Sequence, residues 1–272
     1  MKIERFRNIV EYSSQNSRHM EDKVRVFYRD IGIDANDTIR NFFQLVRPLF
    51  LAKHFLVIEM PFKDHEIGAL CYKGDFMGYT FLNTSLPKAN VDFALCHEVY
   101  HVFYQKTEFE HQVELYMNEQ YYEHEEELAA NLFAGMVLMP EQNFKYMFRK
   151  FENETREEDS RVTILAKLMN YFGVPYMAAL IRCYELNLLE TGNVLKELLN
   201  LDREVIKREF SRLWMDEEIL KATKKNDFNK WMEIIQSEGE KSVAAGYMNE
   251  KAYQKSLRNI ERLYQKIKGE QA

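Results

Sequence analysis

The spacing of apolar side chains predicts helices at the start of the chain. Residues 3–12 and 19–30 favour two short helices within a charged segment. Over residues 34–53, apolar side chains recur at intervals of three and four, which is the period of a helix with one buried face. Pro48 interrupts this pattern, so it is expected to kink the helix or to mark a boundary. Together these elements predict an N-terminal helical segment over residues 1–53.

Three strand-like segments follow this helical start. Residues 54–60 form a short apolar run, and residues 66–72 and 76–82 resemble a hairpin whose turn contains Gly74. Helices are expected in most of the remaining chain, so the pattern predicts a mostly helical α+β fold with one small antiparallel sheet. The edge strand of such a sheet can hold an extended peptide by strand addition, although most hairpins serve only as scaffold.

A strongly apolar helix, expected over residues 93–104, contains three ionisable side chains at its centre. Burying two imidazoles and a carboxylate is costly unless these groups are paired or bound to something. His97 and His101 are four residues apart and therefore lie on one helix face, where both can bind a single Zn²⁺. Glu98, one position further round, can reach a water molecule on that metal. The alternative is that both histidines are hydrogen-bonded core residues.

A second predicted helix supplies a candidate third ligand. It begins with acidic residues at 125–127 and stops at Pro140. Glu127 can complete a His₂Glu site and leave a fourth position open, as catalytic zinc sites require. Asn131, four residues later on the same face, is placed to hydrogen-bond a ligating histidine and fix its ring orientation. The alternative is that the acidic start only complements the positive end of the helix dipole.

These two stretches, in this order, resemble the ImmA/IrrE family of HExxH metallopeptidases. The resemblance runs from about Tyr79 to Pro140 and continues weakly to about Leu189. It departs mildly from the family where Val-Tyr stands between the two histidines in place of Leu-Gly, and where Gly135 stands in place of Ala. Neither departure removes a reacting group. The matching segments are Thr80-Phe-Leu-Asn83, Phe93-Ala-Leu-Cys-His-Glu-Val-Tyr-His101, Glu127-Leu-Ala-Ala-Asn-Leu-Phe-Ala134 and Leu138-Met-Pro140.

The resemblance implies a role for each residue of the predicted site. It makes His97 and His101 metal ligands, Glu127 the third ligand, and Glu98 the catalytic residue. The implied metal is Zn²⁺, although a His₂Glu site can also take Mn²⁺, Fe²⁺ or Co²⁺ because selectivity depends on availability. The predicted chemistry is hydrolysis of a peptide bond, with Glu98 taking a proton from water and delivering it to the leaving amine.

The same resemblance implies a partner and a domain organisation. Members of the family often cleave a helix-turn-helix transcriptional repressor and so relieve repression of stress genes or of a mobile element. We therefore expect a zincin-like (gluzincin) peptidase core over residues 54–190, followed by a helical C-terminal extension over residues 191–272. The alternative is a zinc-containing regulatory binding module, or a toxin–antitoxin component, that binds a partner without cutting it. The presence of Glu98 favours the enzyme, since a structural zinc site needs no base.

Composition limits the compartments and partners. The chain has 272 residues, of which 46% are hydrophobic, and this content supports a buried core. Its formal charge of −6 argues against a surface dominated by phosphate contacts, so no direct nucleic-acid binding is expected, but it leaves room for a local basic patch. Three widely spaced cysteines without a Cys-x-x-Cys pair fit a reducing cytosol. With no signal peptide or long apolar span, we expect a cytoplasmic protein without membrane contact.

Two further patterns leave alternatives open. Cys96 is adjacent to His97 in the expected helix and therefore points to a different side of it. It is expected to be a core residue rather than a metal ligand. Residues 165–175 superficially resemble a helix-turn-helix, but the second helix lacks clustered basic residues, which favours packing against the core.

Aromatic side chains raise the same choice between packing and function. A peptidase needs a donor for the oxyanion that forms at the attacked carbonyl. Candidates in the segment 105–124, each more typical of packing or of the surface, are His111, Tyr116, Tyr121, Tyr122 and His124. The last helix carries an apolar stripe that predicts intramolecular packing, or else docking of a partner or second copy. The stripe consists of Tyr253, Leu257, Ile260, Tyr264 and Ile267.

Overall fold

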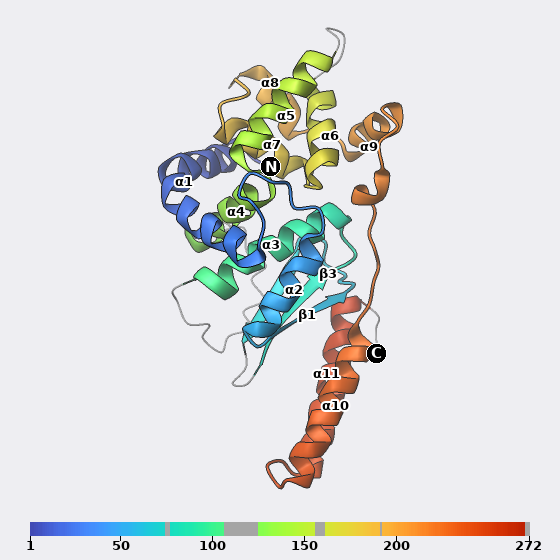
Figure 1. The fold of residues 1–272 in the computed structure, drawn as a ribbon. Coiled ribbons are helices and arrows are strands. Elements are labelled where there is room, and N and C mark those ends of the chain that lie inside the picture. Colours follow the sequence, from blue (N-terminus) through green and yellow to red (C-terminus); the bar gives the residue numbers. More distant parts are fainter. Residues whose placement is uncertain (74–76, 106–124, 156–160, 191, 270–272) are drawn as a thin grey trace.

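The computed structural model describes residues 1–73, 77–105, 125–155, 161–190 and 192–269, and Figure 1 shows their arrangement. Helices dominate, and three short strands form one sheet, so the fold is mostly helical α+β. The elements in chain order are α1 (Ile3–Ile31), α2 (Phe42–Ala52), β1 (Phe55–Met60), β2 (Ala69–Lys73), β3 (Gly78–Asn83), α3 (Lys88–Tyr104), α4 (Glu125–Leu138), α5 (Glu141–Glu154), α6 (Arg161–Phe172), α7 (Tyr176–Glu185), α8 (Asn193–Leu199), α9 (Arg203–Arg212), the 3-10 helix η2 (Glu217–Leu220), α10 (Phe228–Ala244) and α11 (Glu250–Lys268).

The sheet is mixed, with strand order β1-β3-β2. β2 and β3 form the expected antiparallel hairpin, in which Ala69 lies opposite Leu82. β1 instead runs parallel to β3, with Phe55 opposite Gly78, so the prediction of an antiparallel sheet is wrong for β1. After β1 the chain passes to the far edge as β2 and turns back as β3 between the two. β3 therefore points in the same direction as β1.

Alternate side chains of the sheet face two different layers of helices. Leu82 of β3 belongs to the large core that contains α3, whereas its neighbour Phe81 belongs to a second core with α10 and α11. The ring of Phe81 lies edge-on to that of Trp231, with centroids 5.3 Å apart. The rings of Phe228 and Tyr264 stack at 3.6 Å in the same core. The sheet is thus covered by α3 on one face and by the α10–α11 hairpin on the other (Figure 1).

α3 and α4 pack against each other inside the large core, and α4 also packs against α1. Leu95 and Val99 of α3 and Ala130 of α4 are fully buried. Between α1 and α4, the rings of Phe27 and Phe133 meet edge to face at 5.7 Å. Because both helices are enclosed by close-packed neighbours, the side chains between them are held in fixed positions.

The N-terminal helices differ from their prediction. α1 is continuous where two short helices were expected, because the polar stretch between them is held by tertiary contacts. Ser13 in this stretch is buried, and its Oγ donates a hydrogen bond to Glu185 at 2.7 Å. α2 begins only at Phe42. Before it, the Asp34 carboxylate accepts a hydrogen bond from the backbone nitrogen of Asn36, which favours a turn over helix there.

The C-terminal helices contribute to both cores. Leu198 of α8 and Phe210 of α9 join the large core, whereas α10 and α11 form most of the second core. The apolar stripe of α11 packs within the molecule, as one of the two interpretations predicted. Whether residues 54–190 and 191–272 are separate units stays a prediction.

Helices α6 and α7 pack into the large core, in agreement with the packing interpretation of residues 165–175. Leu165 and Leu180 are fully buried.

In the part of the chain that the structure describes, no single helix is long and apolar enough to cross a membrane. Of the described helices, only α6 and α7 taken together reach that length and composition, and they are bent by 106°.

A buried ion pair holds the C-terminal end of α4. Arg182 of α7 donates through Nε to the Met139 carbonyl at 3.1 Å and through Nη1 to Glu185 at 2.9 Å. Its side chain is 5% exposed and that of Glu185 is 7% exposed. Removing the guanidinium leaves both the carboxylate and the carbonyl buried with one partner fewer.

We therefore expect Arg182→Met to lower the free energy of unfolding by about 3–5 kcal/mol, because it leaves a buried carboxylate without its cation. A matched control is Arg25→Met, since Arg25 forms an ion pair with Asp22 at the same three-residue spacing but with side chains 66% and 76% exposed. That change should cost less than about 1 kcal/mol. Urea unfolding of both variants is the measurement, and equal losses would contradict the role given to Arg182.

Candidate metal centre

α3 supplies two imidazoles to the interface with α4. His97 and His101 lie one turn apart on the helix face that meets α4, and their side chains are 15% and 10% exposed. Their Nε2 atoms are 2.9 Å apart. The spacing predicted from the sequence therefore brings the two rings together, with both Nε2 atoms directed at one point.

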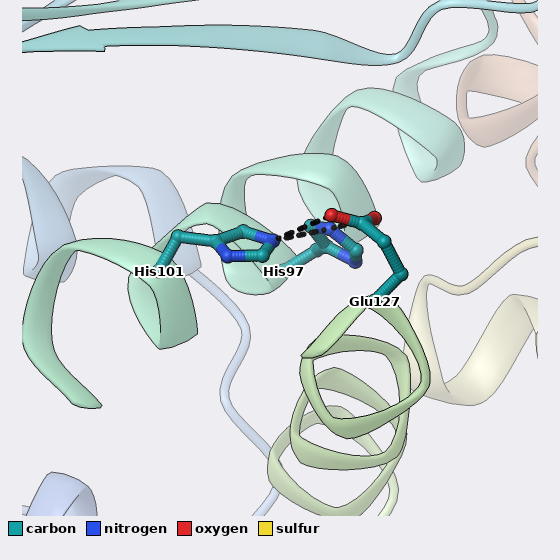
Figure 2. Close-up of side chains that lie close together, drawn as sticks. All are labelled: His97, His101 and Glu127. Carbon is teal, nitrogen blue, oxygen red and sulfur yellow. Dashed lines mark hydrogen bonds and ion pairs between the residues drawn. The ribbon is translucent and has the colours of Figure 1, made fainter. Parts of the chain in front are cut away.

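Glu127 reaches the same point from the first turn of α4 (Figure 2). Its Oε2 atom lies 3.2 Å from His97 Nε2, and its Oε1 atom lies 3.3 Å from His101 Nε2. The three candidate donor atoms lie within 4.8 Å of one another. The structure thus brings together all three residues that the sequence proposed as metal ligands.

The outward nitrogens of both rings bind side-chain amides. Asn131 Oδ1 lies 3.1 Å from His97 Nδ1, and Gln105 Oε1 lies 2.6 Å from His101 Nδ1. An amide oxygen only accepts hydrogen bonds, so each Nδ1 carries a proton. Each Nε2 faces the cluster, where its lone pair becomes available to a metal ion once any proton on it has left. Two imidazole lone pairs and a carboxylate directed at one point form a donor set that fits a divalent transition metal.

His101 and Glu127 strongly affect each other's protonation. Burial alone lowers the pKa of His101, but its hydrogen bond to Glu127 and the negative charge of Glu98 outweigh burial and raise the pKa to about 9. Burial alone raises the pKa of Glu127, but hydrogen bonds from both histidines outweigh it and hold that pKa well below its usual range. Without a cation the cluster therefore holds a proton at neutral pH, and a metal ion displaces this proton when it binds.

Glu98 lies on the same helix but faces β2. It is 7% exposed. Burial raises the pKa of its carboxyl, although the nearby His101 and His97 and a hydrogen bond with the Cys71 thiol of β2 oppose the effect. The thiol itself lies 3.3 Å from the Thr80 hydroxyl of β3. A raised pKa makes the Glu98 carboxylate a better proton acceptor near neutral pH.

Comparison with known proteins agrees with this geometry. Residues 52–184 match the model of the Peptidase_M78 family, described as the IrrE N-terminal-like domain. This segment belongs to the Peptidase_M78 family. It contains the whole of α3 and α4, and with them His97, His101 and Glu127. Residues 52–184 thus form a metallopeptidase domain of this family, with a candidate His-His-Glu metal site.

Two other comparisons add nothing to the family match. No curated protein matches the chain, and no solved structure matches it. The family implies a metal and a protein substrate.

The other residues considered in the sequence analysis do not belong to the described metal-ligand cluster. Cys96 is fully buried, which confirms that it is a core residue. The candidate oxyanion donors lie outside the described residues, namely His111, Tyr116, Tyr121, Tyr122 and His124.

Gln105 is a contact of the Peptidase_M78 site that sequence analysis missed. It follows the last residue of α3 and lies four positions after His101, so the spacing alone places it near that ring. Its Nε2 atom donates to Glu126 Oε2 at 2.5 Å. Gln105 therefore joins the end of α3 to the start of α4, directly beside Glu127. It acts as a positioning residue for His101.

Gln105→Leu is expected to weaken metal binding about 10–100-fold, because the His101 ring loses the acceptor that fixes its orientation and tautomer. Gln105→Glu keeps an acceptor oxygen for His101 Nδ1 but loses the donor to Glu126, so it should weaken metal binding less than Gln105→Leu does. Competition with a chromophoric chelator measures both variants. If the Leu variant binds metal as tightly as the unmodified protein, Gln105 does not position His101.

Proposed function

We propose that this protein is a zinc-dependent endopeptidase with a zincin-like core. The observation that carries the proposal is the convergence of His97, His101 and Glu127 from two packed helices of a Peptidase_M78 segment. Three protein ligands are the number that a catalytic zinc site uses. A metal held by them would polarise the scissile carbonyl and lower the pKa of a water molecule.

Glu98 is the proposed catalytic base. As the neighbour of His97 on α3, it lies beside the donor cluster without belonging to it. It takes a proton from the attacking water and delivers this proton to the leaving amine. Burial raises the pKa of its carboxyl and so supports this role, because a more basic carboxylate accepts a proton from water more readily.

The outer edge of β2 is the proposed binding edge for the substrate backbone. Among the described strands β2 pairs only with β3, so its second row of backbone groups is open to a further strand. Cys71 of β2 forms a hydrogen bond with Glu98. A peptide added along this edge by β-augmentation therefore runs close to the proposed base.

The proposed substrate is a helix-turn-helix transcriptional repressor in the cytoplasm. Its cleavage would relieve repression of stress genes or of a mobile element. This part of the proposal rests on the resemblance to the ImmA/IrrE family and is an analogy. The cytoplasmic assignment is supported by Cys71, Cys96 and Cys183, all three of which are free.

Glu98→Gln tests the proposed mechanism. The amide keeps the size of the side chain but accepts no proton. Cleavage of a helix-turn-helix repressor, either co-purified or encoded by a neighbouring gene, should therefore slow by about 10²–10⁴-fold. Metal content should stay unchanged, because Glu98 is not among the donor atoms. Cleavage is followed by gel electrophoresis and mass spectrometry, and metal content by elemental analysis.

Asp92→Asn is the matched control, since Asp92 is also a partly buried carboxylate of α3 and pairs with Lys88 one turn away. This variant should cleave at nearly the normal rate. Chelator-treated protein should not cleave. If the Glu98→Gln variant cleaves as fast as the unmodified protein, Glu98 is not the base. If the unmodified protein binds metal and forms a stable complex with the repressor but does not cleave it, the binding module is favoured.

A further inference from the structure

α11 carries a row of five basic side chains along one face. We call it the basic row, and all of its members are exposed. Successive members are three or four residues apart, so they fall in one stripe along the helix. At 1.5 Å per residue the row is about 22 Å long. Its members are Lys251, Lys255, Arg258, Arg262 and Lys266.

The basic row lies on the side of α11 opposite to its packed side. With 3.6 residues per turn, Tyr253, Ile260 and Tyr264 point about half a turn away from the row. The Tyr253 ring packs so closely on Gly239 of α10 that a methyl group there would meet it at 2.3 Å. The turn end of the α10–α11 hairpin projects beyond the sheet (Figure 1), and all members of the row are exposed along its length.

Among the described residues, the basic row has no acidic partner. Within the described residues, none of its members forms an ion pair or a side-chain hydrogen bond. Other exposed basic residues do pair with an acid on the neighbouring turn, as in Arg25–Asp22 and Lys207–Glu204, both at 2.6 Å. Like charges one turn apart destabilise a helix, so an anion bound along the row removes a repulsion that the free protein retains.

The charge of α11 contrasts with that of the whole chain. The helix contains six basic and two acidic residues and so has a net charge of +4, whereas the chain has a formal charge of −6. Glu250 and Glu261, the two acids, lie off the row by about a quarter of a turn. The expectation of no direct nucleic-acid binding came from the net charge of the whole chain, which does not reveal this local concentration of positive charge.

We propose that the basic row binds the phosphate backbone of double-stranded DNA without sequence preference. A straight row of positive charges matches the dense and regular negative charge of a duplex. Asn259 and Gln265 flank the row, and such amide side chains donate hydrogen bonds to phosphate oxygens. Contacts of this kind position a protein on DNA but read no bases.

Two other anionic partners fit the row less well. An amphipathic helix binds a membrane by inserting its apolar face, but the apolar face of α11 is already packed in the second core, where Tyr264 is 8% exposed. A protein partner needs an apolar, desolvated centre in the interface, and the row has only charged side chains with amides beside them.

DNA binding at α11 is separate from the peptidase site, which lies between α3 and α4. It would place the enzyme on the same DNA that its proposed repressor substrate occupies. The Glu98→Gln variant should bind DNA as tightly as the unmodified protein. Failure of DNA binding and failure of peptide cleavage are therefore distinguishable.

The test is fluorescence anisotropy of a labelled duplex of about 20 base pairs with the full-length protein. Five phosphate contacts predict a slope of about −4.5 in log affinity against log salt, and so roughly a 500-fold loss of affinity between about 50 and 200 mM salt. Removing three of the charges, as in the combined variant Lys255→Gln, Arg258→Gln and Arg262→Gln, should reduce the slope by about 2.7 and weaken binding at least about tenfold at low salt.

The control removes the same number of exposed charges from α9, as Arg203→Gln, Lys207→Gln and Arg208→Gln. Its affinity should stay within about twofold of the unmodified protein, whereas an equal loss would show a general charge effect. Circular dichroism melting confirms that both variants fold. The proposal is overturned if the unmodified protein does not bind the duplex, or if the α11 variant binds the duplex as tightly as the unmodified protein. Binding to anionic vesicles or polyglutamate in preference to the duplex also overturns it.

Discussion

The structure depends on the pairing of three ionisable side chains that are buried between two apolar helices. His97, His101 and Glu127 converge where α3 packs on α4, and ionisable groups left unpaired at such a place are costly to bury. Their mutual hydrogen bonds offset this cost, and the retained proton neutralises part of the charge. A divalent cation satisfies the same donors more completely, so metal binding and a stable α3–α4 interface reinforce each other.

The rest of the large core keeps these donors in place by fixing α4 at both ends. At its start, Gln105 binds Glu126 at 2.5 Å. Towards its end, the Tyr28 hydroxyl of α1 donates to the Val137 carbonyl at 2.6 Å, and Arg182 of α7 donates to the carbonyl that follows the helix. Elements distant in sequence thus determine the position of the first turn of α4. A sub-ångström error in that turn would move Glu127 away from the two rings.

Local spacing predicted most of the candidate site, but not the contacts that the tertiary structure adds. The four-residue intervals of His97 with His101 and of Glu127 with Asn131 define shared helix faces, and the structure places all four side chains accordingly. Gln105 lies at the same interval after His101, but the helix is expected to end at residue 104, so the shared-face argument does not extend to it. The direction of β1, the continuity of α1 and the covering of the sheet by α10 and α11 depend on long-range packing, which periodicity does not encode.

X-ray absorption spectroscopy of the zinc-loaded protein tests the central claim most directly, because it reports the atoms bound to the metal. The account predicts two imidazole nitrogens and carboxylate oxygen at about 2.0–2.2 Å, with no sulfur in the coordination sphere. In a Glu127→Gln variant the oxygen contribution should fall while both imidazoles remain. A zinc–sulfur distance of about 2.3 Å, or a spectrum without imidazole, would contradict the site formed by His97, His101 and Glu127.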